Sequence, residues 1–151
     1  MLGNEGLNRL LREQLGAGAG VVGYVGHGSV ELWAGSVLTA AQAAQLSSVG
    51  LSVIVPLTCL NGYFQDPVGD SLAEALLKAP TGGAVAVWAS SGLTETEDQL
   101  PIGVALLRQL EPTTGTPVRL GDLIWQAKRT SSNDDIRSTW ILFGDPTTWV
   151  H

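Results

Sequence analysis

Short apolar runs alternate along the chain with segments in which leucines recur at helical spacing. Within residues 7–15 (LNRLLREQL) the leucines follow the i, i+3, i+4, i+8 stripe of an amphipathic helix, and the glycine-rich residues 16–20 end it. The run 21–25 (VVGYV) is short and β-branched without polar alternation, which is typical of a strand buried on both faces of a parallel sheet. The chain therefore begins with a predicted helix followed by a predicted strand.

The same alternation continues through the middle of the chain. Residues 39–46 favour a short helix, and residues 51–55 (LSVIV) favour a second buried strand that Pro56 closes. Ser71 and Glu74 have the S-x-x-E spacing of a capping box, which predicts that a helix starts at this serine. We expect that helix to end at the proline and glycines that follow it.

The C-terminal part repeats the pattern once more. Residues 84–89 (AVAVWA) predict a third strand, and residues 97–111 and 120–127 predict two helices. Residues 139–146 predict a fourth strand that a Gly-Asp-Pro turn closes, with its aspartate as a turn residue. Four apolar positions mark the face that we expect the first of these helices to bury: Leu100, Val104, Leu107 and Leu110.

The alternation of strands and helices predicts an α/β fold with a parallel sheet and helices on its faces. The loosest segments, residues 111–118 and 130–136, show no regular pattern. No repeat or linker interrupts the chain, so we expect a single domain spanning residues 1–151.

Composition narrows the class of partner. Of the 151 residues, 44% are hydrophobic, which is sufficient for one buried core. The formal net charge of -6, with only 8 Lys and Arg, disfavours nucleic acid and anionic membrane surfaces as partners. The longest apolar run, residues 51–60, is about half as long as a membrane-spanning helix. The N-terminus lacks the pattern of a signal peptide.

Two reactive side chains follow the first two predicted strands. His27 comes soon after the first strand, and Cys59, the only cysteine, comes soon after the second. Ligands of parallel sheets bind at the carboxyl ends of the strands, and strands joined by one crossover are expected to be neighbours. A thiol and an imidazole at one edge form a nucleophile and proton-transfer pair suited to acyl transfer. The N–H groups of Gly28 and Cys59 are candidates to hold the oxyanion, at roughly 3 kcal/mol per donor.

Other interpretations of these residues stay open. His27, between two glycines, is also compatible with a simple turn, and Cys59 with a small buried apolar residue. A zinc site needs three or four protein ligands, whereas the chain has one cysteine and two histidines, so we expect no metal. Irregular glycine spacing and the lack of a P-loop lysine argue against nucleotides, so we expect no cofactor. Trp88, with Ser90 beside it at the end of the third strand, is the best candidate to wall a substrate pocket.

Several blocks of the chain together resemble the gingipain-type cysteine peptidases, a family of the caspase-like group. The most specific blocks are the histidine block, residues 24–33 (YVGHGSVELW), and the cysteine block, residues 55–64 (VPLTCLNGYF). Residues 70–92, 120–128 and 140–150 look like the framework of the same family. The resemblance thus covers nearly the whole chain in order.

The resemblance implies a three-layer caspase-like α/β fold with a mostly parallel sheet. It implies peptide-bond hydrolysis through a thioester acyl-enzyme, with Cys59 as nucleophile, His27 as proton-transferring partner, and Gly28 and Cys59 as oxyanion donors. Peptides or proteins are then the substrates, and the family's mostly exported bacterial members imply a secreted or cell-surface location. A catalytically silent pseudo-peptidase or a secretion-associated binding module with the same fold is the alternative.

Catalytic domains of this family are longer than this chain, which corresponds to their C-terminal half. We therefore expect the sheet to lack its N-terminal strands and to expose an unpaired edge. Such an edge predicts association with a missing N-terminal half or self-association.

Overall fold

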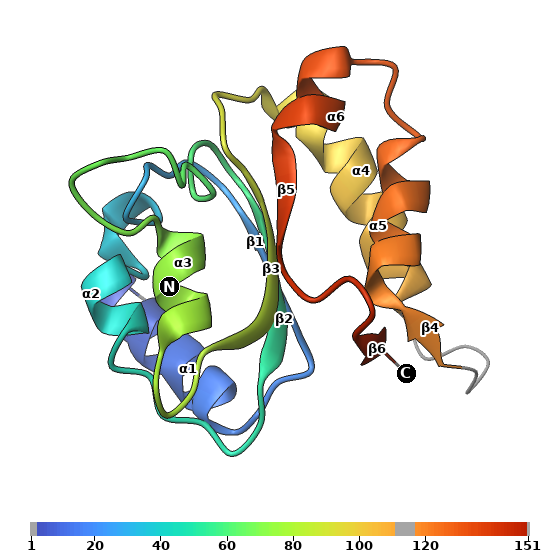
Figure 1. Cartoon of the computed structure of the whole chain (residues 1–151). Helices are drawn as coiled ribbons and strands as arrows, with labels where there is room; N and C mark the ends of the chain where they lie inside the picture. The colour runs from blue at the N-terminus through green and yellow to red at the C-terminus, as the bar shows by residue number, and fades with distance from the viewer. Residues whose placement is uncertain (1–2, 111–116, 151) are drawn as a thin grey trace.

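The centre of the protein is a four-stranded sheet in the order β1-β2-β3-β5 (Figure 1). The computed structural model describes residues 3–110 and 117–150. The strands of the sheet are β1 (Val21–Val25), β2 (Ser52–Leu57), β3 (Ala84–Ser90) and β5 (Trp140–Gly144). β1 pairs with β2 and β2 with β3 in parallel, whereas β5 runs antiparallel to β3. All four strands expected from the sequence are present, and the mostly parallel sheet is confirmed.

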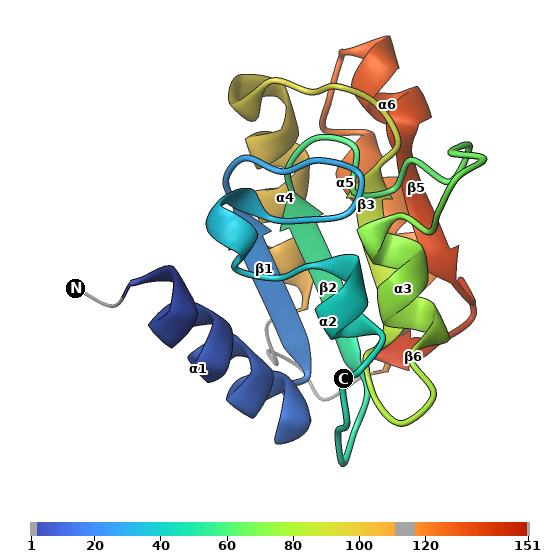
Figure 2. The same ribbon diagram turned by 90° about the vertical axis from the view of Figure 1, so that its left-hand side faces the viewer.

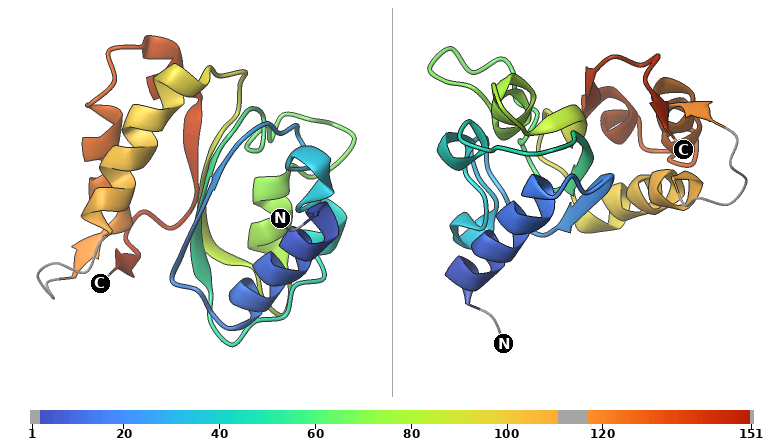
Figure 3. Two further views of the ribbon diagram at one scale, coloured as in Figure 1. Left: turned by 180° about the vertical axis from the view of Figure 1, so that it is seen from behind. Right: turned by 90° about the horizontal axis from the view of Figure 1, so that it is seen from below.

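Helices cover both faces of this sheet, which gives the three-layer arrangement seen in Figures 1 and 3. One face carries α1 (Asn4–Gly16), α2 (Ala40–Ala43) and α3 (Leu72–Lys78). The other face carries α4 (Thr96–Gln109) and α5 (Leu120–Lys128). All five helices match helices that the sequence predicts.

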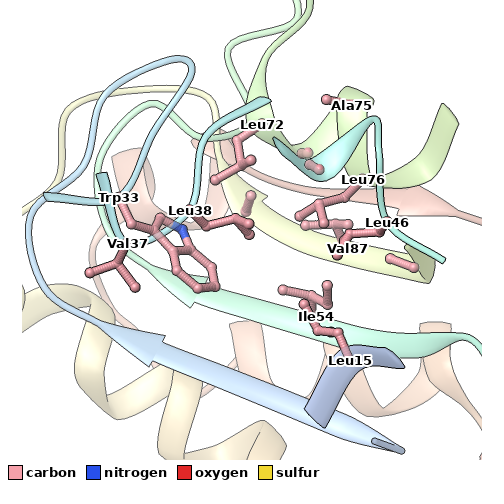
Figure 4. Close-up of a cluster of buried hydrophobic side chains, with 14 residues drawn as sticks. Leu15, Trp33, Val37, Leu38, Leu46, Ile54, Leu72, Ala75, Leu76 and Val87 are labelled. Carbon is pink, nitrogen blue, oxygen red and sulfur yellow. The ribbon is translucent and has the colours of Figure 1, made fainter. Parts of the chain in front are cut away.

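Two hydrophobic cores lie on opposite sides of the sheet because successive strand residues point to opposite faces. In β2, Ile54 packs into the core under α1, α2 and α3, and Val53 and Val55 pack into the core under α4 and α5. Figure 4 shows the first core, in which Leu38, Leu72 and other side chains surround Trp33. β2 is buried at all of its positions, as a continuous apolar run predicts for a central strand.

Local signals explain where several helices start. Ser71 caps α3 through the predicted capping box: the Glu74 N–H donates to Ser71 Oγ, and the Ser71 N–H donates to the Glu74 carboxylate at 3.0 Å. Thr39 and Gln42 form the same reciprocal pair at the start of α2. These hydrogen bonds satisfy N–H groups that have no partner within the helix.

Strand β1 differs from the prediction that both of its faces are buried. Its residues alternate between exposed and partly covered, and the Val21 and Val25 side chains are 40% and 59% exposed. The reason is its position, because β1 is the last strand of the sheet and its outer edge pairs with no strand among the described residues (Figure 2). An apolar run without alternation cannot distinguish an edge strand from a central one.

The predicted end of the second strand, just before Pro56, is also wrong. Pro56 lies inside β2, which continues to Leu57 and stays paired with β1 through Val25↔Leu57. The ladder between β2 and β3 ends earlier, at Ile54↔Val87, so the missing proline N–H breaks no bond on that side.

Helix α4 buries a different face from the one its leucines mark. The buried residues are Gln99, Ile102, Gly103 and Leu106. Leu100, which was expected inside, is 40% exposed, and the other three expected positions are only partly buried. A Cβ on Gly103 would lie 2.5 Å from the Leu57 methyl groups, so the glycine lets α4 approach the sheet on this side.

Small elements occupy parts of the segments for which no structure was expected. Asn133 caps α6 (Asp134–Thr139), accepting hydrogen bonds from two backbone N–H groups with its side chain. A short antiparallel pair joins β4 (Val118–Arg119) to β6 (Trp149–Val150), and η1 (Ala34–Ser36) is a 3-10 turn. Residues 111–116 of the first loose segment lie outside the described residues.

Candidate active site

The carboxyl ends of β1, β2 and β3 point to the same edge of the sheet, where the loops that follow them gather (Figure 2). The last paired residues of β1 and β2 are Val25 and Leu57. His27 and Cys59 each follow these residues at the same interval of two. The structure thus places the predicted pair on neighbouring loops at the edge where parallel sheets bind ligands.

The Cys59 side chain is a free, partly buried thiol. Its S–H donates to the Thr94 carbonyl oxygen at 3.3 Å. A carbonyl accepts such a bond only while the sulfur carries its proton, so this contact belongs to the neutral thiol. Within the described residues, no group of three or more His, Cys, Asp or Glu side chains is placed to hold a metal ion.

Main-chain hydrogen bonds hold the loop that carries Cys59. The Leu60 N–H donates to the Gly92 carbonyl at 3.1 Å, and the Gly62 N–H donates to the Ser90 carbonyl at 2.8 Å. Leu60 has a positive φ of 60°, a conformation that is uncommon for residues other than glycine. The turn directly after the cysteine is therefore sharp and fixed against the end of β3.

The loop that carries His27 is held by main-chain hydrogen bonds and by side chains together. The His27 carbonyl accepts hydrogen bonds from the Tyr24 hydroxyl and from the Ala34 N–H, both at 2.8 Å. The Tyr24 ring stacks on the Trp33 ring with 4.2 Å between centroids and 2° between planes. Burial raises the pKa of Tyr24, and a backbone hydrogen bond at Ala34 opposes that rise. The imidazole itself is exposed at the surface.

Asn61 connects the two loops and was missed by the analysis of the sequence. Its buried side chain accepts a hydrogen bond from Trp33 Nε1 at 2.7 Å and donates one to the Ser29 carbonyl at 2.6 Å. The available signal was its position, since Asn61 stands two residues after Cys59 inside the cysteine block. Trp33 stands in the histidine block, so both blocks contribute to one contact.

Gly28 lies where the His27 loop passes closest to β2. A Cβ at this position would come within 2.6 Å of Thr58 Oγ1 and 3.0 Å of the Leu32 carbonyl oxygen, so a larger residue would force the neighbouring atoms to move. In the described part of the chain, neither the Gly28 N–H nor the Cys59 N–H donates a hydrogen bond to a protein acceptor. Among the described residues, both proposed oxyanion donors are thus left without an acceptor.

The prediction that Trp88 walls a substrate pocket is wrong. Its side chain is fully buried in the core under α4 and α5. There its ring packs edge-on against the Trp140 ring, with 4.9 Å between ring centroids and 64° between ring planes. Strand alternation turns this residue away from the edge of the sheet and into the core. Ser90 is also fully buried, and its hydroxyl donates to the Gly92 carbonyl at 3.1 Å, so it shapes the turn behind Cys59 and offers no surface to a substrate.

Comparison with known proteins shows which family the chain matches. The model of peptidase family C25 matches residues 3–151. The complex of the Porphyromonas gingivalis RgpB pro- and mature domains has a TM-score of 0.85 and 22% identity, covering 95% of this chain and 37% of that chain. The crystal structure of the Arg-specific cysteine proteinase gingipain R (RGPB) has a TM-score of 0.77 and 25% identity, covering 95% of this chain and 36% of that chain.

A third solved structure, described as a protease, has a TM-score of 0.74 and 17% identity and covers 92% of this chain and 37% of that chain. A search of the curated proteins gives no match. The fold and the paired loops define a protein of the gingipain type with a caspase-like α/β sheet. Because the family model covers nearly its whole length, the chain belongs to peptidase family C25, the gingipain-type cysteine peptidases. It spans little more than a third of the solved chains that it matches.

Proposed function

We propose that this chain is a cysteine peptidase that cleaves peptide bonds with Cys59 as nucleophile and His27 as proton-transfer partner. The observation that carries the proposal is the placement of both residues at the same interval beyond the last paired residues of two adjacent parallel strands. Family membership supports the reaction class. Peptides and proteins are the substrate class that follows from it.

The reaction proceeds in two stages, formation of a thioester and its hydrolysis. The His27 imidazole takes the Cys59 thiol proton, and the thiolate attacks the carbonyl carbon of the scissile bond. His27 then gives the proton to the leaving amine as the C–N bond breaks, which leaves a thioester. A water molecule, deprotonated by His27, attacks the thioester, releases the carboxylic acid and restores the thiol.

Two features of the site support this sequence of steps. The unused N–H groups of Gly28 and Cys59 are available for the oxyanion that forms at each attack, and such donors are worth roughly 3 kcal/mol each. The bond from the Cys59 thiol to the Thr94 carbonyl has to break before attack, by rotation of the cysteine side chain. Catalytic hydrogen bonds often form only once substrate is bound, so this resting contact is compatible with the mechanism.

The location and the assembly of the protein are part of the proposal. Family membership supports action outside the cell or at its surface. Within residues 3–110 and 117–150, no helix is long and apolar enough to cross a membrane. The outer edge of β1 leaves backbone N–H and C=O groups for a further strand, from an N-terminal half or a second copy. Sedimentation of the purified chain as a stable monomer would contradict this dependence on a further chain.

Covalent labelling tests the assignment of the nucleophile. The purified chain is treated with a library of peptidyl acyloxymethyl ketones, and the adducts are followed by mass spectrometry. We expect labelling at Cys59, loss of labelling in Cys59→Ala, and slow labelling in His27→Ala. Because the chain has one cysteine, any labelled thiol is that of Cys59.

The second histidine of the chain supplies the matched control. His151→Ala should label at the wild-type rate. Folding of each variant is checked by circular dichroism. If no member of the library labels the folded wild-type chain after an N-terminal half has been supplied, the catalytically silent alternative replaces this proposal. If His27→Ala labels as fast as wild type, the histidine has no part in the reaction.

A further inference from the structure

We infer that Asn61 is a positioning residue that sets where His27 lies relative to Cys59. The inference rests on the proposed function of those two residues and adds a third to the same site. Asn61 does not reach the reacting atoms; it acts through the two loops that carry them.

The Asn61 side chain uses both ends of its amide in a fully buried position. Its oxygen accepts from the Trp33 indole N–H at 2.7 Å, and its nitrogen donates to the Ser29 carbonyl at 2.6 Å. Both partners belong to the loop after β1, whereas Asn61 belongs to the loop after β2. Buried hydrogen bonds of this kind are costly to leave unmade, because each deserted partner keeps its desolvation penalty.

The chemistry of the two partners requires an uncharged amide. The indole N–H only donates and the carbonyl only accepts, so the residue between them has to accept on one side and donate on the other. An aspartate carboxylate has no N–H for the Ser29 carbonyl and places two oxygens against each other. An aliphatic residue of the same size satisfies neither Ser29 nor Trp33.

The contacts of Asn61 reach His27 through a short chain of bonded groups. Ser29 N–H donates to the Leu32 carbonyl at 2.9 Å, which closes the turn that follows the histidine. Trp33 stacks on Tyr24, whose hydroxyl donates to the His27 carbonyl. Loss of the Asn61 contacts therefore removes side-chain support from both ends of the loop that holds His27, and leaves the main-chain bonds from Gly26 to Leu57 and from Ala34 to His27.

On the other side, Asn61 is fixed to the framework next to Cys59. The Asn61 carbonyl accepts from the Ala73 N–H in the first turn of α3 at 3.0 Å. Leu60, with its positive φ, separates Asn61 from Cys59 by one residue. The hydrogen bonds of the Asn61 side chain thus fix the histidine loop relative to the cysteine loop.

The test is the rate at which iodoacetamide alkylates Cys59 as a function of pH, measured on the full chain. We compare wild type, His27→Ala, Asn61→Ala, Asn61→Asp and the two double variants with His27→Ala. In wild type, His27 should change both the rate and the shape of the pH profile. In the Asn61 variants, the ratio of the rates with and without His27 should fall to about one, the non-additive result expected of coupled residues.

A control separates positioning from loss of stability. Asn133→Ala removes a side chain that caps α6 and bonds Asp98 on the other side of the sheet. It should lower the melting temperature and leave the pH profile of Cys59 unchanged. If the Asn61 variants also keep the wild-type profile, Asn61 has a structural role only and the inference is overturned.

Hydrogen exchange tests whether Asn61 holds the His27 loop even if His27 has no part in the reaction. The backbone N–H of Ser29 and the indole N–H of Trp33 should lose protection in Asn61→Ala, whereas N–H groups of β2 and β3 should keep theirs. If His27→Ala leaves the alkylation profile of wild type unchanged, the proposed dyad fails while the exchange result still reports on the loops. Unchanged protection in the His27 loop overturns the inference by itself.

Discussion

The loops that carry Cys59 and His27 lie side by side but are held by different kinds of contact. The Cys59 loop is held by main-chain hydrogen bonds from Leu60 and Gly62 to the end of β3. The His27 loop also has main-chain bonds, from Ala34 to His27 and from Leu72 to Val30. It depends in addition on side chains: the Tyr24 hydroxyl, the stacked ring of Trp33 and the Asn61 amide.

The difference teaches which part of the site is sensitive to sequence. Main-chain hydrogen bonds survive most substitutions, because every residue except proline supplies the same groups. Side-chain contacts disappear with a single mutation. The position of Cys59 is therefore a property of the fold, whereas the position of His27 depends in addition on a few specific side chains.

The largest expected effect comes from Trp33→Ala. The indole is 1% exposed, stacks on Tyr24 and donates to Asn61, so its loss should lower the free energy of unfolding by about 3–5 kcal/mol. Urea denaturation followed by circular dichroism measures it. Trp125→Ala is the control, since that side chain is 59% exposed, and a similar loss in both variants would contradict a special role for Trp33.

Gly28→Ala tests the close approach of the two loops. The added methyl group would lie 2.6 Å from Thr58 Oγ1, and overpacking of this kind costs about 1–3 kcal/mol. We also expect slower labelling of Cys59 by peptidyl ketones. Gly20→Ala is the matched variant because nothing lies within 4 Å of its added Cβ, and it should leave both measurements unchanged. Equal behaviour of the two variants would show that the loops have room to separate.

Ser71→Ala addresses the framework of the Cys59 loop. Removal of the α3 cap should cost about 1 kcal/mol of stability. The bond from Ala73 to Asn61 joins main-chain atoms and does not use the Ser71 hydroxyl, so the alkylation rate of Cys59 should stay at its wild-type value. A large change in that rate with a small change in melting temperature would mean that the cysteine loop also depends on single side chains.

A smaller effect is expected for Tyr24→Phe, which keeps the stacked ring and removes only the bond to the His27 carbonyl. The loss of stability should be about 0.5 kcal/mol, because a partly exposed hydrogen bond contributes little net free energy. The pH profile of Cys59 alkylation should move part of the way toward that of His27→Ala. An unchanged profile would indicate that stacking alone holds the histidine loop.

The smallest effect is a dependence of stability on alkaline pH. Burial raises the pKa of Tyr24 in the folded state, so the unfolded chain loses this proton first as the pH rises. The corresponding stabilisation is complete below about pH 10 and is lost as the pH rises through the folded-state pKa. Melting temperatures above that pH should fall more steeply for wild type than for Tyr24→Phe, with Tyr63→Phe as control. Equal slopes would contradict the assignment.

Periodicity and capping signals predicted all four strands of the sheet and five of its helices. They did so because each signal acts within a few residues: the capping box at Ser71 needs only Glu74, and the core face of α5 is visible in its own sequence. The buried face of α4 was not predictable in this way. Gly103 selects it by allowing contact with Leu57, a residue more than forty positions away.

The candidate site divides in the same manner. His27, Gly28 and Cys59 were chosen as candidates because strand ends can be read from the sequence and parallel strands align their ends. Trp88 was misassigned because proximity to a strand end does not say which way a side chain points, and Trp140 covers it in the core. Asn61 was missed because its importance lies in partners supplied by another loop.

The sequence by itself determined the alternation of elements, the start of α3 at its capping box, and the residues available for chemistry. Its motif blocks also indicated the family to which the chain belongs. Only the tertiary structure decided that β1 is an edge strand, which face α4 buries, and how the His27 loop is joined to the Cys59 loop. The physical reason is range: local hydrogen bonds and apolar spacing are encoded in neighbouring residues, whereas burial and contacts between loops depend on residues that only folding brings together.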